Sequence, residues 1–157
     1  MAKSIKRYKY WALITLLILM VMGAYFAFNP SYQKSLESKF YYSIGDYEKA
    51  YILSSEAYAL EPYNRMARSV MVHSQYALRY VHYNQEAKAF LDTIRSYADQ
   101  EKITLSEQMR IKMMCDIMIE KHEKMQPTIL IDKDLVKEAQ ENYEKFRKLH
   151  ANLTQVL

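Results

Sequence analysis

The sequence predicts an all-α protein with one membrane-spanning helix at its N-terminus, and three observations support this. Residues 10–28 contain no charged side chain, and Thr15 is their only strongly polar residue. Outside that stretch Gly45 is the single glycine, and the chain is rich in residues that favour helices. Four basic residues precede the stretch, with no acidic residue among them.

Residues 10–28 have the length and the flanks of a transmembrane helix. As a helix they extend about 28 Å at roughly 1.5 Å per residue, which matches the hydrocarbon core of a bilayer. Tyr10 and Trp11 lie at one end and Tyr25 and Phe28 at the other, as aromatic residues do at membrane interfaces. The alternative is a buried helix of a soluble protein, but such helices usually keep a polar stripe. We therefore expect a membrane anchor.

The charge distribution predicts the orientation of this anchor. Lys3, Lys6, Arg7 and Lys9 precede it, and positive flanks stay in the cytoplasm. Residues 1–9 are then cytoplasmic and residues 29–157 extracytoplasmic. The small size and plain architecture favour a bacterial inner membrane, in which the external part is periplasmic. Of the 22 Lys and Arg, 18 remain after these four, against 18 Asp and Glu. The external part is neutral overall, so its charge does not indicate a nucleic-acid partner.

A cleaved secretory signal peptide has the same order of basic and apolar residues. Its cleavage site requires small residues two positions apart, but Ala27 follows Tyr25 at that spacing and Ala24 follows Met22. The sequence therefore favours an uncleaved anchor over a cleaved signal.

The few turn-forming residues divide the external part into helices. Asn29 and Pro30 end the anchor and can start a helix that runs over residues 32–44. Gly45 suits the position just after its C-terminus, Asp46 can cap the next helix, and Pro62 lies just beyond that helix.

Residues 45–64 resemble the second helix of a tetratricopeptide repeat, a family of antiparallel helix pairs in units of 34 residues. The matching helix-packing positions are Gly45 at the turn, Ala50 and Ala57 at the close contacts, and Pro62 at the end. The preceding helix lacks the Trp and the Leu-Gly pair of the family. The resemblance implies helical hairpins stacked as in that family, although not as a regular array.

A second, more degenerate unit is expected to follow. Asn64 can cap a helix that ends near Tyr80, and Asn84 can cap the next, whose apolar positions include Ala87, Phe90 and Ile94. The fold class expected is thus a transmembrane helix followed by a stack of antiparallel hairpins.

Two more helices are expected beyond residue 100. Thr104 and Glu107 form a possible capping box, and either Asp132 or Asp134 can cap the last helix after the apolar run 129–131. The last helix has an apolar or aromatic stripe at Val136, Ala139, Tyr143, Phe146, Leu153 and Leu157. We expect it to pack over the preceding helices and not to form a coiled coil with another copy.

No arrangement of residues indicates catalysis, a metal or a cofactor. The four histidines are scattered, Cys115 is the single cysteine, and no glycine-rich phosphate loop is present. A site assembled from Glu107, His122 and Glu123 is the enzymatic alternative. We regard the chain as a non-enzyme with no small-molecule substrate.

Tyrosine is the unusual residue: eleven of fifteen lie between residues 32 and 97. On the helix after Asn64, a rotation of 100° per residue separates one set of side chains from the apolar face. That set is a candidate partner-binding surface: Arg65, Ser69, His73, Tyr76, Tyr80 and Tyr83. Aromatic residues mixed with polar ones are typical of recognition surfaces, but internal packing of the same residues is the alternative.

Together these features predict a membrane-anchored protein–protein interaction module. Such a protein would serve as a scaffold, assembly factor or chaperone-like subunit of an envelope complex and would bind a peptide or helix. The alternative is a purely structural subunit of a larger membrane complex, with no groove of its own.

Overall fold

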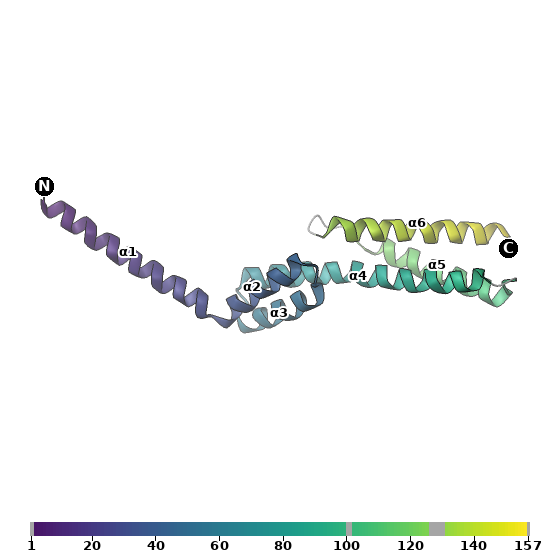
Figure 1. The fold of residues 1–157 in the computed structure, drawn as a ribbon, viewed down its shortest axis with the longest axis horizontal. Coiled ribbons are helices and arrows are strands. Elements are labelled where there is room, and N and C mark those ends of the chain that lie inside the picture. The colour runs from purple at the N-terminus through teal and green to yellow at the C-terminus, as the bar shows by residue number, and fades with distance from the viewer. Residues whose placement is uncertain (1, 100–101, 126–130, 157) are drawn as a thin grey trace. The chain divides into compact units, whose positions relative to one another are not determined.

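A computed structural model describes residues 2–99, 102–125 and 131–156, with side chains for residues 10–25, 27–99, 102–125 and 131–153. All regular secondary structure in the described residues is helical, with no strand among them (Figure 1). The helices are α1 (Ala2–Phe28), α2 (Pro30–Ser43), α3 (Tyr47–Leu60), α4 (Arg65–Ala98), α5 (Leu105–Glu123) and α6 (Lys133–Val156). Residues 1–74 and 75–157 form two compact units, which divide within α4.

In the first unit α2 and α3 form an antiparallel hairpin (Figure 1). Asn29 caps α2 by accepting a hydrogen bond from the Ser31 amide, and Pro30 occupies its first turn. Gly45 has a φ of 84°, the left-handed conformation that glycine adopts without strain after a helix. Asp46 then caps α3 through the Lys49 amide. These predicted helix ends are confirmed.

The hairpin packs through small side chains. Ser31, Ser35 and Ser38 of α2 are buried, as are Ala50 and Ala57 of α3. The Ser31 hydroxyl donates to the Ala57 carbonyl at 2.8 Å, so the α2 face meets the α3 backbone directly. Small residues permit this close approach of two helices, and the buried hydroxyls find backbone acceptors.

Asn64 joins the start of α4 to this hairpin. Its side-chain oxygen accepts a hydrogen bond from the Ala67 amide, as a helix cap does, and its amide group donates to the hydroxyls of Ser31 and Ser35. The residue is 1% exposed, so these bonds are made away from water. The predicted cap at Asn64 is confirmed, and its side chain also links α4 to α2.

The break expected at Asn84 is wrong, because α4 continues from Arg65 to Ala98 as one helix of 34 residues. No proline or glycine interrupts it near position 84, so nothing ends the helix there. Residues 65–80 and 84–98 therefore do not form the antiparallel hairpin that a second repeat unit requires.

The second unit buries its core between the C-terminal part of α4 and the helices α5 and α6. This core contains Tyr83 of α4, Met118 of α5 and Phe146 of α6. The capping box of Thr104 and Glu107 at the start of α5 is present, and Asp132, one of the two candidates, caps α6. Leu157 and residues 126–130, which include most of the expected apolar run 129–131, lie outside the described residues.

Among the described residues, no single helix has both the length and the hydropathy expected of a membrane span. The segments Tyr10–Tyr25 and Pro30–Ser43 meet both criteria when taken together, as a pair of helices bent by 68°.

Candidate functional site

The six predicted partner-binding residues are divided between the two units. Arg65 and Ser69 are exposed and His73 is half-buried in the first unit, where its ring lies 6.2 Å from that of Tyr42. The remaining three residues, Tyr76, Tyr80 and Tyr83, belong to the second unit.

These three tyrosines contribute mainly to packing. Tyr80 is 4% exposed and Tyr83 3%, both within the core, and Tyr76 packs against that core beneath the guanidinium of Arg79. Burial raises the pKa of both Tyr80 and Tyr83, so their phenols are neutral. Tyr80 and Tyr83 are therefore unavailable to a partner in this conformation, and internal packing explains them better than a groove.

Asn84 has a role that differs from the predicted helix cap. Its amide group donates to the Leu135 carbonyl and to the Glu138 carboxylate, and its oxygen accepts from Asn142. All three partners belong to α6. Asn84 and Asn142 are each 6% exposed. This buried polar contact fixes the register of α6 on α4, since a shifted α6 would leave the amides unpaired.

The helix-packing positions lie as the sequence suggests. Ala50 and Ala57 are completely buried between α2 and α3, Gly45 forms the turn, and Pro62 follows the end of α3. The same geometry forms in any tightly packed helical hairpin, so these positions do not by themselves identify a repeat family.

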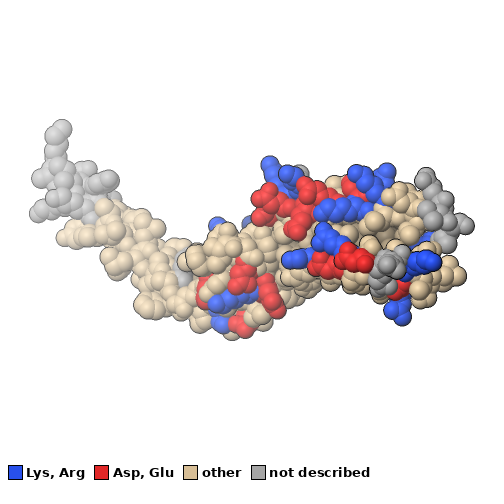
Figure 2. Space-filling view, turned by 45° about the vertical axis from the view of Figure 1, so that its right-hand side comes forward, with Lys and Arg blue, Asp and Glu red and all other residues tan. Residues whose placement is uncertain are grey.

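Along α1 the apolar side chains have no covering partner. Every residue from Tyr10 to Tyr25 is exposed, and Trp11 is 66% exposed. Residues 10–25 include no charged side chain, and this stretch of α1 shows no blue or red in Figure 2. The Thr15 hydroxyl donates to the Trp11 carbonyl at 2.6 Å, so the one strongly polar side chain is satisfied within the helix. Such a surface suits an apolar environment better than water.

The hairpin exposes a second apolar surface. Leu36 and Phe40 of α2 and Ile44, the residue that follows its last turn, are 65%, 58% and 59% exposed, and we call the three the α2 apolar face. Apolar residues four apart usually mark the side of a helix that packs, but here the serine side packs and the apolar side is open.

A third apolar surface lies on α5. Leu105, Met109 and Met113 are 60%, 61% and 56% exposed, and we call them the α5 ridge. They lie on the opposite side of α5 from the buried residues Ile111, Cys115 and Met118. Because α5 has apolar residues on two sides, one side remains open when the other enters the core.

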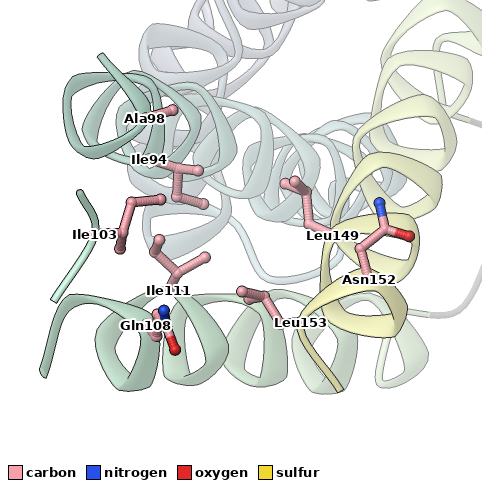
Figure 3. Close-up of a pocket in the computed structure, with 8 residues that line it drawn as sticks. All are labelled: Ile94, Ala98, Ile103, Gln108, Ile111, Leu149, Asn152 and Leu153. Carbon is pink, nitrogen blue, oxygen red and sulfur yellow. The ribbon is translucent and has the colours of Figure 1, made fainter. Parts of the chain in front are cut away.

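An apolar cavity of about 300 Å³ lies where α4, α5 and α6 meet in the second unit. Aliphatic side chains from the three helices and from Ile103 point toward one another around it (Figure 3). Gln108 and Asn152 are its polar members. The cavity can hold an apolar group, but it offers few polar atoms to orient one.

The residues of the enzymatic alternative have structural partners. Glu107 completes the capping box of α5, and the His122 ring stacks on that of Tyr143 at 4.3 Å between centroids. Burial lowers the pKa of His122 more than Glu123 and Glu144 raise it. In the part of the chain that the structure describes, no three His, Cys, Asp or Glu side chains gather as metal ligands would.

Comparison of the chain with models of protein families, with curated proteins and with solved structures gave no match. The three exposed apolar surfaces are therefore the candidate functional sites among the described residues. Sequence reasoning identified the first, on α1. A face of three serines opposite the apolar residues of α2, and apolar residues on two sides of α5, are the signals for the other two.

Proposed function

We propose that this chain is a single-pass membrane protein whose helical domain holds a partner protein at the outer surface of the membrane. The uncovered apolar surface of α1 between Tyr10 and Tyr25 carries the proposal. Burying these sixteen uncharged residues in lipid removes from water a surface that no other described part of the first unit covers.

The four basic residues in the N-terminal part of α1, at positions 3–9, define the orientation. They keep the N-terminus in the cytoplasm and place residues 29–157 outside it, in the periplasm if the cell is bacterial. The hairpin of α2 and α3, with its glycine turn and buried alanines, is compatible with a tetratricopeptide-like unit. The continuous α4 limits that likeness to one hairpin.

The α5 ridge is the surface that we assign to the partner protein. Its three side chains lie four residues apart, and such a ridge fits the groove between rows of side chains on another helix. The ridge ends at Asp116 and Glu120, which are paired with His150 and Lys124. Its apolar part therefore spans little more than two helical turns, which suits one crossing helix of a partner. Methionine side chains adapt their shape to such a contact.

Membrane insertion is tested with the full-length protein carrying a C-terminal tag. The protein should remain in the membrane after alkaline extraction, and protease added to the outer side should remove the tag. Release by alkali, or a tag that is protected outside and cleaved inside, would refute the anchor or its orientation.

The partner contact is tested separately by placing a photoreactive amino acid at Met109 in native membranes. The matched control places it at Lys148, an exposed residue of α6 in the same unit. We expect a partner that crosslinks through position 109 only, at residues spaced three or four apart as on one helix. A Leu105→Ser, Met113→Ser double variant with unchanged helical content should lose it. Equal crosslinking from both positions, or none from position 109, would contradict this assignment and favour a subunit held by other surfaces.

A further inference from the structure

The junction between α1 and α2 is held by side chains on both sides of Asn29. The Asn29 amide donates to the Tyr25 carbonyl and so continues the hydrogen bonding of α1, while its side chain caps α2. Gln33 of α2 reaches back to the Ala27 carbonyl at 2.6 Å. The direction in which α2 leaves α1 is therefore set by hydrogen bonds and not by a free linker.

That direction keeps α2 close to the end of α1. The two helices are bent by 68° with respect to each other. At roughly 1.5 Å per residue, the 14 residues of α2 extend about 21 Å and rise only about 8 Å along the axis of α1. The headgroup region on each side of a bilayer is roughly 5–8 Å thick. If α1 spans the membrane, the whole of α2 stays near its surface.

The end of α3 lies at the same level. Asn29 donates to the Glu61 side chain at 3.3 Å, and Leu60 and Tyr25 line one hollow at the junction. Leu60 is 59% exposed, and Tyr63 in the turn that follows is 92% exposed. Apolar and aromatic side chains therefore gather beside the end of the anchor, where a bilayer interface accepts them.

The side of α2 that is free to meet the bilayer is the apolar one. Ser31, Ser35 and Ser38 occupy the side toward α3 and Asn64, and the α2 apolar face lies about 180° around the helix at 100° per residue. Glu37 is exposed and lies about 60° from Phe40 around the helix, so its carboxylate marks one edge of this face. Nothing in the described first unit covers the α2 apolar face.

We propose that α2 is an interfacial helix that lies along the surface of the membrane, with Leu36, Phe40 and Ile44 entering the boundary between headgroups and acyl chains. Helices with one apolar and one polar side bind membranes in this way. The inference rests on α1 being the anchor, and it adds a second lipid contact that holds the hairpin against the membrane. The partner helix on the α5 ridge is a separate contact.

The test uses tryptophan fluorescence, because Trp11 is the only tryptophan of the chain. Full-length protein is reconstituted into phosphatidylcholine vesicles, with or without bromine atoms high on the acyl chains, which quench nearby tryptophan. The wild type reports on the anchor through Trp11. A Trp11→Phe, Phe40→Trp variant reports on α2. The matched control is Trp11→Phe, Ile52→Trp, because Ile52 is 48% exposed on α3 and points away from the packed side of the hairpin.

We expect strong quenching of Trp11, at least half as much from position 40, and none from position 52. If Trp11 is quenched and position 40 is not, the anchor stands and the interfacial helix is refuted. If Trp11 is not quenched, the anchor and this inference both fail. Equal quenching at positions 40 and 52 would also refute the inference, because the hairpin would not present one side to the lipid. A Leu36→Trp variant replaces Phe40→Trp if circular dichroism shows the latter to be misfolded.

Discussion

Asn64 stabilises the first unit through three hydrogen bonds, and its replacement should have a large and local effect. Asn64→Ala removes the bond from the Ala67 amide, and losing such a helix cap costs about 1 kcal/mol. It also removes the bonds to the Ser31 and Ser35 hydroxyls at 2.9 and 2.8 Å, each worth about 1 kcal/mol. The free energy required to open the hairpin should therefore fall by about 3 kcal/mol.

A second variant separates the two contributions. Asn64→Ser keeps an oxygen that can cap α4 but lacks the amide group that reaches both hydroxyls. It should cost about 2 kcal/mol, because only the interhelical hydrogen bonds are lost. Asn152→Ala is the control, since that asparagine is exposed and surface changes usually stay within about 0.5 kcal/mol.

Hydrogen exchange of the full-length protein in detergent micelles measures this effect by segment. A loss of 3 kcal/mol should accelerate exchange of the protected amides of α2 and α3 by about two powers of ten. Amides of α5 should be unaffected, because the second unit does not use these bonds. If exchange in α2 and α3 were no faster for Asn64→Ala than for Asn152→Ala, the linking role of Asn64 would be refuted.

Two further predictions concern the second unit. Burial lowers the pKa of His122 below its ordinary 6.5, so the unfolded chain binds a proton more readily, and the free energy of unfolding should fall as the pH drops below about 6.5. His122→Phe keeps a ring against Tyr143 and should weaken this dependence of the unfolding free energy on pH, as measured by urea titrations above and below pH 6.5. If the dependence were unchanged, it would come from other groups. Cys115 is completely buried, and burial raises its pKa to about 11, so a maleimide should react with it only when the unit opens. Met118→Ala should accelerate this reaction strongly by leaving a cavity, whereas Asn64→Ala should not; rapid labelling of the native wild type would show that the thiol is accessible.

Helix ends could be predicted from the sequence wherever their cause was local. The cap at Asn29, the turn at Gly45 and the capping box at Thr104 each depend on residues within four positions of one another. The cap predicted at Asn84 failed because an asparagine side chain has several possible partners. With no helix breaker nearby, α4 continues, and Asn84 bonds to α6 more than fifty residues away.

The candidate surfaces could not be predicted in the same way, because periodicity shows that a helix has two sides but not which side packs. On α2 an apolar side competes with a side of three serines. The serine side packs because its small residues meet the alanines of α3 and because Asn64 adds two hydrogen bonds there. On α4 the predicted separation of the tyrosines from the core failed because Tyr80 and Tyr83 are enclosed by α5 and α6.

The two open apolar surfaces on α2 and α5 call for different occupants, because their surroundings differ. The α2 apolar face belongs to a helix whose start is fixed to α1 by Asn29 and Gln33, so it cannot move away from whatever surrounds the end of α1. If that environment is a bilayer, lipid reaches this face without any further binding event. The α5 ridge has no such connection to α1, and the carboxylates of Asp116 and Glu120 limit it to a short apolar segment. A short ridge bounded by charges is poorly suited to a broad lipid surface and well suited to a single helix, which is why we assign the ridge to a protein and the α2 face to the membrane.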